Sequence, residues 1–347
     1  MAQLLTVSAV GSVLVVCLIA VLLGLVIYSP IDPVELELPV PLPPPTHYKK
    51  NGLQSVIKAG EGLIDGAEDV CVDKSGAVYA PSRDGWIRKM HPNGSWENWK
   101  MVGSSTMLGL TVSRDDGHLL IADATLSDSF DICDSFADEV IEASDGTAYF
   151  SDPSTKFWLH DWFLDVLEAK PNGRLLKYDP STKKTSVLID RLAFANGVAL
   201  SPTEDFLIVC ETWRFQCLKY WLKGELEGKQ EVFVDNLPGG PDNIHLAADG
   251  TYWIALLPLR FEGLLDFIIH RSPIVKRVIA GFPKLVDAIS SLNKATVANV
   301  GPDGKIRKMY DDSDGSVMTF LTSALEFDGH LYLGSLRTNF VGKLPLN

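Results

Sequence analysis

Four oxygen-bearing side chains occupy one equivalent position in a repeated sequence pattern, and together they could bind a metal ion. The pattern is a glycine, often preceded by Asp or Ser and followed by an apolar strand, as in "SDGTAYFSD" and "ADGTYWIAL". In one copy, "PTEDFLIVC", Glu204 stands in the place of the glycine. Counting back eight residues from this place reaches, in four copies, Glu68, Asp138, Asn196 and Asp242. In the two other copies the same position holds Gly109 and Leu321.

Carboxylate and amide oxygens are the ligands that hard cations prefer. Ca²⁺ accepts six to eight oxygens at about 2.3 to 2.6 Å, so three carboxylates and one amide would leave places for water or substrate. Without a cation, three carboxylates this close would repel one another and raise one another's pKa. We therefore predict Ca²⁺ at these four residues, with Asp242 also positioning or deprotonating a water molecule. The alternative is that these side chains cap strand ends by bonding to loop amides.

The strands that must position these residues predict an all-β protein. Asp-Gly between β-rich runs is typical of a hairpin. Six copies, with spacings such as the 41 residues from Gly76 to Gly117, suit four strands per unit and hence a six-bladed β-propeller. Equivalent positions of the innermost strands would then converge at one end of the central channel. The stretch "LQSVIKAG" near the start would complete the last blade, and closure leaves only short, protected strand edges.

The second repeat is short. Only 29 residues separate Gly117 from Gly146, and "IADATLSDSFDICDSFADE" has room for about one strand. We predict a truncated second blade with an exposed strand edge. The truncation immediately precedes Asp138, so this ligand depends most on the local fold.

The first 50 residues lie outside the repeats. Residues 4–28 contain no charged side chain, and about 20 apolar residues suffice to cross a bilayer. We interpret residues 1–28 as an uncleaved transmembrane signal anchor rather than a signal peptide, because no small-residue cleavage site follows cleanly. Residues 29–50 are dense in proline and predict an extended stalk. Residues 51–347 form the propeller.

One later segment interrupts the strand pattern. Residues 272–292 place apolar side chains at intervals of three and four, which predicts an inserted amphipathic helix. Its apolar stripe consists of Ile274, Val275, Val278, Ile279, Phe282, Leu285, Val286 and Ile289. We expect this helix to pack on one face of the propeller. A lid that contacts the membrane is the alternative, which Lys276, Arg277 and Lys284 on the other face favour.

Composition and isolated motifs limit the partners and the compartment. A formal net charge of −13 argues against nucleic acid, which clustered Lys and Arg bind, and is compatible with a divalent metal. Cys210 and Cys217 flank "ETWRFQ" in an expected hairpin, where they would form a disulfide or remain buried free thiols. Asn93 begins "NGS", a glycan acceptor if the propeller is lumenal. The cysteine and histidine spacings match no zinc motif.

Several of these stretches resemble a known family. "GRLLKYDPSTKKTSVLIDRLAFANGVALSPTEDFLIVCET", "NLPGGPDNIHLAADGTYWIAL" and "LEFDGHLYLGSL" look like the strictosidine synthase-like proteins, close to the membrane-anchored plant members and more distantly similar to adipocyte plasma membrane-associated proteins. The resemblance covers about residues 50–347 and implies a six-bladed propeller of the wider calcium-dependent phosphotriesterase group. It also implies a small-molecule substrate and a place in the endomembrane system, in the endoplasmic reticulum or the vacuole. In gluconolactonase-type relatives the metal ligands are a Glu, two Asn and an Asp, which fall on Glu68, Asp138, Asn196 and Asp242, with Asp replacing Asn at 138.

The function that the resemblance favours is calcium-dependent hydrolysis of an ester or lactone. A binding propeller with a structural metal is one alternative, and condensation of an amine with an aldehyde is another. Strictosidine synthase itself uses a glutamate just upstream of the last "DG" strand, where this chain has Thr322 or its neighbours, with Glu326 nearby. The histidine dyad of paraoxonase has no match among His91, His118 and His160, and the chain lacks a Gly-x-Ser-x-Gly elbow. The sequence specifies neither the substrate nor the oligomeric state.

Overall fold

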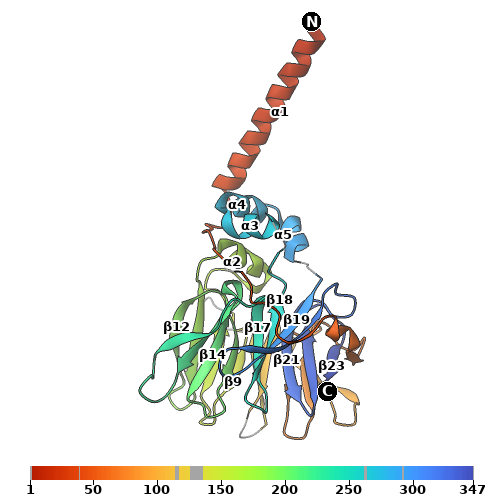
Figure 1. The fold of residues 1–347 in the computed structure, drawn as a ribbon, viewed down its shortest axis with the longest axis vertical. Helices are drawn as coiled ribbons and strands as arrows, with labels where there is room; N and C mark the ends of the chain where they lie inside the picture. The colour runs from red at the N-terminus through yellow and green to blue at the C-terminus, as the bar shows by residue number, and fades with distance from the viewer. Residues whose placement is uncertain are drawn as a thin grey trace.

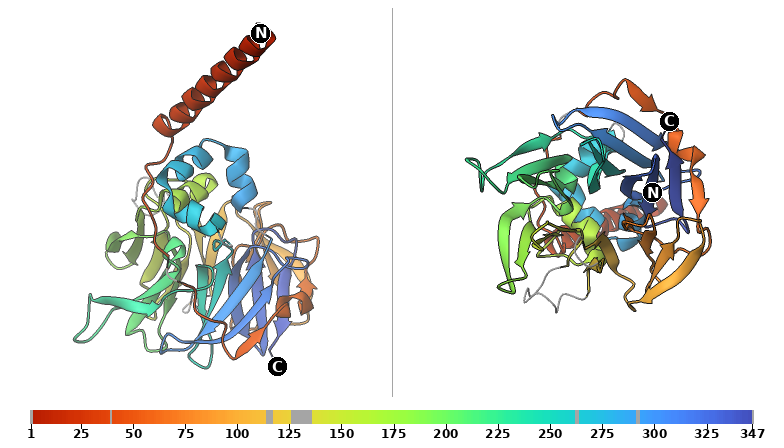
Figure 2. Two further views of the ribbon diagram at one scale, coloured as in Figure 1. Left: turned by 45° about the horizontal axis from the view of Figure 1, so that its top comes forward. Right: turned by 90° about the horizontal axis from the view of Figure 1, so that it is seen from below.

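The computed structural model describes the backbone of residues 2–38, 40–113, 117–125, 136–261, 264–290 and 293–346. Side chains are described for these residues except at 2–12, 14, 264, 265, 267, 268, 287, 289 and 290. Six sheets stand radially around one axis, as Figure 2 (right) shows from below. Five of them have four or five strands, and the sixth has two. The chain is thus an all-β propeller, as the repeats predicted, with five complete blades.

The strands of each blade follow one another in the chain, apart from two that close the ring or extend a sheet. The first complete blade contains β3 (Cys71–Val72), β4 (Val78–Pro81), β5 (Trp86–Met90) and β6 (Trp96–Met101). The two-stranded sheet contains β7 (Met107–Val112) and β8 (Leu119–Asp123). The next blade contains β9 (Val140–Glu142), β10 (Ala148–Asp152), β11 (Gly173–Asp179) and β12 (Lys184–Leu192).

The remaining three blades complete the ring. One contains β13 (Ala195–Leu200), β14 (Phe206–Glu211), β15 (Gln216–Trp221) and β16 (Gln230–Val234). The next contains β17 (Gly240–Leu246), β18 (Tyr252–Leu257), β19 (Ala295–Val300), β20 (Ile306–Asp312) and β1 (His47–Lys49), which adds in parallel to β20. The last contains β21 (Leu321–Phe327), β22 (His330–Ser335), β23 (Val341–Pro345) and β2 (Ile57–Ala59).

Closure of the ring follows the prediction made from "LQSVIKAG". Strand β2, from that stretch, pairs antiparallel with β23, the last strand of the chain. The final blade therefore joins residues from both ends of the propeller. This pairing satisfies a strand edge that would otherwise be open, and it ties the start of the propeller to its end.

Turns of the repeat explain why glycine recurs in it. Gly76, Gly146 and Gly250 adopt positive φ angles of 84°, 80° and 81°, a region that residues with a Cβ seldom occupy. In the degenerate copy Glu204 takes this conformation with φ 56°. Its carboxylate accepts hydrogen bonds from the backbone N–H and the hydroxyl of Ser144. These bonds to the neighbouring blade offset the strain of the left-handed backbone.

The short second repeat forms only the β7–β8 hairpin among the described residues. Residues 126–135, which the sequence places in the same interval, lie outside the described part of the chain. The sequence prediction of a reduced second unit therefore agrees with the strands that are described. Asp138 nevertheless keeps its place, because β9 pairs with β10 directly after it.

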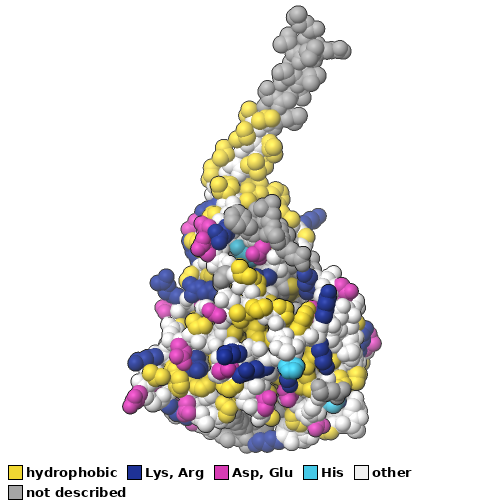
Figure 3. Space-filling model, viewed as in Figure 1, with side chains coloured by type: hydrophobic (Ala, Val, Ile, Leu, Met, Phe, Trp, Pro, Cys, Tyr) yellow, Lys and Arg dark blue, Asp and Glu magenta, His cyan; other side chains and the backbone are white. Residues whose placement is uncertain are grey.

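Helices cover one end of the propeller, the upper end in Figure 1. They are α2 (Trp162–Glu168), α3 (Leu264–Arg271), α4 (Pro273–Ala280) and α5 (Pro283–Ser290). Short 3-10 turns occur elsewhere in the chain at Gly52–Ser55, which packs against β20, and at Leu159–Asp161 and Thr212–Arg214. Beyond these helices extends α1 (Ala2–Ile27). Apolar side chains cover the described part of α1 (Figure 3). Within the described residues, no helix combines the length and apolar character needed to cross a membrane.

The single helix predicted over residues 272–292 is wrong in two respects. Gly281 and Pro283 divide the segment into α4 and α5, because proline begins a helix readily but cannot continue one. The predicted stripe is also only partly buried, since Ile274 and Phe282 are 65% and 45% exposed. Lys276, expected on the polar face, is 1% exposed, and its Nζ donates to the carbonyl of Val34 at 2.7 Å.

The proline-rich segment at 29–50, interpreted from the sequence as a stalk, lies against the propeller and its helices, and its residues 47–49 form β1. Ile31 and Pro33 are buried. The N–H of Asp32 donates to the carboxylate of Glu168, and the N–H of Leu36 donates to the carbonyl of His270. Since these contacts reach α2 and α3, the segment fixes the start of the propeller to its helical end.

Candidate metal and substrate site

The four residues selected by their position in the repeat line one cavity. Glu68, Asp138, Asn196 and Asp242 surround a space of about 50 Å³, which is room for a cation or a few water molecules. Glu68 and Asp138 lie just before β3 and β9, and the other two lie within β13 and β17. Leu159 and Trp162, which begin the α2 region, form another wall. The cavity therefore lies at the helical end of the channel.

Local irregularities of the inner strands occur at two of these residues, Asn196 and Asp242. The register between β13 and β14 shifts between Ala195 and Val198, around Asn196. The register between β17 and β18 shifts between Pro241 and Ile244, around Asp242. Such bulges bend a strand and redirect a side chain, and they are frequent beside functional sites.

Glycines permit the inner strands to approach closely at this level. A Cβ at Gly197 would lie 2.4 Å from the carbonyl oxygen of Asp242, and one at Gly109 would lie 2.6 Å from that of Asp138. The repeat that holds Gly109 at the ligand position therefore contributes space instead of a ligand. Leu321, the sixth equivalent residue, is fully buried in the core.

Burial and mutual repulsion govern the charge of the three carboxyl groups. Burial raises the pKa of Glu68 well above its ordinary value, and the charges of Asp242 and Asp138 raise it further. Burial, followed by the charge of Asp138, likewise raises the pKa of Asp242. The pKa of Asp138 rises to about 7, again mainly through burial. The ionised forms are thus costly unless a positive charge lies among them.

The kinds of oxygen atom that line this cavity suit a hard cation. The side-chain oxygen of Asn196 is buried and has no hydrogen-bond partner within the described chain, and the Asn196 side chain lowers the pKa of Asp242 against the larger effect of burial. Next to Asp242, the amide of Asn243 donates to both carboxylate oxygens of Glu68 at 3.0 Å. The Asn243 contacts orient the Glu68 carboxylate, and the Asn196 side chain lines the cavity. Carboxylate and amide oxygens without nitrogen or sulfur suit Ca²⁺.

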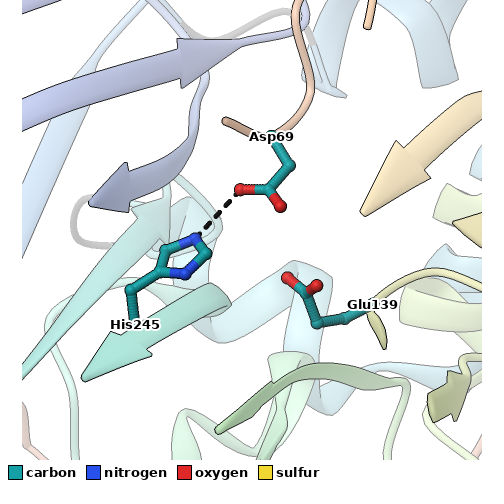
Figure 4. Close-up of side chains that lie close together, drawn as sticks. All are labelled: Asp69, Glu139 and His245. Carbon is teal, nitrogen blue, oxygen red and sulfur yellow. Dashed lines mark hydrogen bonds and ion pairs between the residues drawn. The ribbon is translucent and has the colours of Figure 1, made fainter. Parts of the chain in front are cut away.

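A second cluster of polar side chains lies further along the channel and was not foreseen from the sequence. Atoms of Asp69, Glu139 and His245 lie within 4.8 Å of one another (Figure 4). His245 Nε2 lies 2.9 Å from Asp69 Oδ1, and the hydroxyl of Ser323 donates to the same oxygen at 2.5 Å. Burial, then the charge of Asp69, raises the pKa of Glu139. Asp69 and Glu139 directly follow two residues of the first cavity, so the repeat contained a signal for them.

The residues considered for condensation or for a histidine dyad do not line the inner cavity. The hydroxyl of Thr322 donates to the carbonyl of Glu68, and Glu326 accepts a hydrogen bond from the indole of Trp253 at 2.6 Å. Neither Thr322 nor Glu326 is among the residues that line the inner cavity. His91 pairs with Glu97 on the first blade. His118 lies outside the lining, and His160 lines an adjoining cavity described next.

A larger outer cavity adjoins the first. It has a volume of about 570 Å³, and it shares Leu159, Trp162 and Leu336 with the inner cavity. Arg83, Trp158 and His160 form part of its wall. A volume of this size is typical of small-molecule sites. The two cavities together would hold a ligand, one end of which reaches the four oxygen-bearing side chains.

The two remaining sequence expectations concern residues that line neither cavity. Cys210 and Cys217 lie opposite each other in the register of β14 and β15 and are joined by a disulfide. Asn93 is exposed in the turn between β5 and β6, and its side chain accepts hydrogen bonds from Ser95. Glycosylation of Asn93 stays a prediction.

Comparisons with known proteins give a consistent family relationship. A family model described as strictosidine synthase matches residues 138–225. Protein STRICTOSIDINE SYNTHASE-LIKE 4 of Arabidopsis thaliana is 32% identical over 312 residues, which are 83% of this chain and 81% of that protein. Adipocyte plasma membrane-associated protein of Mus musculus is 39% identical over 217 residues, or 61% of this chain. The match spans 52% of the mouse protein, about half of its length.

Solved structures share the fold at low sequence identity. A gluconolactonase from Xanthomonas campestris aligns with a TM-score of 0.57 at 13% identity and covers 91% of this chain and 98% of that one. A calcium-binding protein, regucalcin, from Agrobacterium tumefaciens aligns with a TM-score of 0.52 at 14% identity and covers 86% and 95%. At these identities the likeness shows the propeller fold alone.

Proposed function

This chain belongs to the strictosidine synthase-like family, and we propose that it is a calcium-dependent hydrolase of esters or lactones. The observation that carries the proposal is the convergence of Glu68, Asp138, Asn196 and Asp242 on one buried cavity. Support also comes from the Asn196 oxygen, which has no partner among the described residues although it is buried. A buried amide oxygen without a partner costs free energy, so a ligand at this point would stabilise the site.

The residues of the chain would perform distinct tasks in this reaction. When bound, Ca²⁺ would polarise the carbonyl group of the substrate. Asp242, which lines the cavity together with Asn196, would position or deprotonate the attacking water molecule. Glu68 is held by the amide of Asn243. The apolar walls formed by Leu108, Phe136 and Phe194 would exclude bulk water and strengthen electrostatic interactions inside the cavity.

The descriptions of two structural neighbours are consistent with calcium-dependent hydrolysis but do not establish it for this chain. One structural neighbour is described as a gluconolactonase and another as a calcium-binding protein. Condensation of an amine with an aldehyde has less support, because Thr322 and Glu326 are engaged elsewhere. We also propose that the β7–β8 sheet is a reduced sixth blade, since β7 contacts the innermost strands β3 and β9 on its two sides.

Attachment to a membrane remains part of the proposal. The uncharged run at residues 4–28 and the exposed apolar side chains of α1, such as Val16 at 65%, favour an anchor. We accordingly place the propeller in the lumen of the endoplasmic reticulum or the vacuole, with a glycan at Asn93. Protease protection of the propeller in sealed microsomes, and its loss after detergent, would test this orientation.

Turnover measured with and without metal tests the hydrolase. We expect hydrolysis of aryl acetates or lactones in the presence of Ca²⁺, its loss with a chelator, and a decrease of at least about 100-fold in Asp242→Ala. Asp249→Ala is the matched control, because Asp249 belongs to the same repeat but lies exposed in a turn and bonds Thr251. Turnover that is absent, or that survives the chelator, refutes the hydrolase. If the chelator still lowers the melting temperature, the metal serves a binding propeller instead.

A further inference from the structure

We propose that the outer cavity selects esters or lactones with an aromatic or apolar body and a negatively charged group, and that Arg83 pairs with this group. The reaction in this inference rests on the proposed hydrolase function. The substrate class rests on three separate observations, which are the continuity of the two cavities, the character of the outer wall and the charge of one arginine.

Continuity of the cavities gives the substrate its direction. Because Leu159, Trp162 and Leu336 line both spaces, a molecule can extend from one into the other. The inner space of about 50 Å³ holds little more than an ion and a reacting group, whereas the outer space of about 570 Å³ holds the body of a small molecule. The reacting bond therefore lies at the four oxygen-bearing side chains and the rest of the molecule lies outside them.

The outer wall is largely apolar and aromatic. Trp162 is fixed by edge contacts with Phe163 and Phe320, whose ring centroids lie 5.3 and 5.9 Å away. Trp158 lines the same cavity and is 45% exposed. Flat indole faces of this kind bind aromatic or apolar groups and lose water-exposed area when they do.

Arg83 is the charged group of this wall that lacks a carboxylate partner within the described chain. By contrast, Arg88, Arg174 and Arg277 each pair with an aspartate. The hydrocarbon part of Arg83 packs over Gly66, where an added Cβ would lie 3.0 Å from its Cδ and Nε. The other titratable side chain in the wall, His160, already lies 3.0 Å from Asp161. Arg83 is exposed, so its guanidinium can pair with a carboxylate or similar anion that enters the outer cavity.

Charge also fixes the orientation of such a substrate. The residues that line the inner cavity include no basic side chain, whereas the outer wall contains Arg83. An anionic substituent of the substrate is therefore attracted to the outer wall. The neutral ester or lactone group therefore points inward. The arrangement favours a molecule with its charge distant from the reacting bond.

Binding of a matched pair of probes tests the substrate class without turnover. In isothermal titration calorimetry on the full chain, with Ca²⁺ and with chelator, we expect 2-naphthoate to bind about tenfold more tightly than its neutral analogue 2-naphthamide. Arg83→Gln should reduce this ratio to about one. Arg83→Lys should retain part of it. Arg307→Gln is the control, since Arg307 is an exposed arginine paired with Asp303 on the blade of β17 to β20 and should keep the wild-type ratio.

A kinetic measurement adds the link to catalysis. The ratio of kcat/KM for 4-carboxyphenyl acetate over phenyl acetate should fall about tenfold in Arg83→Gln relative to wild type, because the intrinsic reactivity of each ester cancels in the comparison. An unchanged naphthoate preference in Arg83→Gln overturns the assignment of Arg83. Equal binding of both probes by the wild type overturns the anionic substrate class. If neither ester is hydrolysed but the binding ratio depends on Arg83, the hydrolase fails and the ligand class stands.

Discussion

Calcium should stabilise the folded protein through the four residues of the inner cavity, and Asp242→Asn should remove most of this effect. All four side chains are buried, with exposures between 2% and 6%, so bulk salt screens their interaction with a bound ion only weakly. At a Ca²⁺ concentration of about 100 times Kd, binding to the folded state contributes about 2.7 kcal/mol. For a domain of this size, about 2 °C per kcal/mol gives a rise in melting temperature of roughly 5 °C.

Replacing Asp242 with asparagine keeps the volume and one oxygen but removes a negative charge next to the ion. If affinity falls about 100-fold, the same Ca²⁺ concentration equals the new Kd, and the stabilisation falls to about 0.4 kcal/mol, or about 1 °C. Differential scanning fluorimetry across a Ca²⁺ titration measures both values. Asp165→Asn is the control, because Asp165 is equally buried but bonds Ser154, Asn172 and Trp213 away from the cavity. A wild-type Ca²⁺ shift in Asp242→Asn, or loss of the shift in Asp165→Asn, would refute the proposed site.

Two further predictions concern stability away from the site. Replacing Cys210 and Cys217 together with serine should lower the free energy of unfolding by about 2 kcal/mol, because the disulfide closes a short loop of the unfolded chain; urea denaturation measures this loss, and an unchanged midpoint contradicts it. Burial lowers the pKa of Lys276 from 10.5 to about 8, so the unfolded chain holds its proton to higher pH than the folded protein does. The free energy of unfolding of the wild type should therefore increase as pH rises from 8 to 10.5, and that of Lys276→Met should lack this increase. If the free energy of unfolding changes with pH in the same way in both proteins, the lowered pKa of Lys276 is contradicted.

Much of the inner cavity could be predicted because a propeller repeats one local pattern around an axis. Residues at the same position of Asp-Gly repeats occupy the same level of the channel, so Glu68, Asn196 and Asp242 converge although they are far apart in the chain. The close approach at Gly197 was not predicted, because it depends on the distance between two blades. The cluster of Asp69, Glu139 and His245 was not predicted, because only the tertiary structure brings His245 of β17 beside the two residues that follow Glu68 and Asp138.

Segments without a repeat were predicted less well. The apolar periodicity of residues 272–292 correctly indicates helix, but it does not show the interruption, because Pro283 begins a second helix without changing the apolar pattern. Lys276 was assigned to a polar face because periodicity takes no account of what lies outside the helix. Its ammonium group is buried because the extended segment around Val34 covers it.

The sequence alone determined the propeller, the strand that closes it, and the four residues that face its channel, because hairpin turns and strand alternation are local and each blade repeats them. Tertiary structure decided which surfaces become cavities. The outer space beside Arg83 and Trp158 exists because loops from different blades and the start of α2 meet at one end of the channel. Such contacts depend on packing between residues distant in sequence, and no local pattern records the distance or the angle at which they meet.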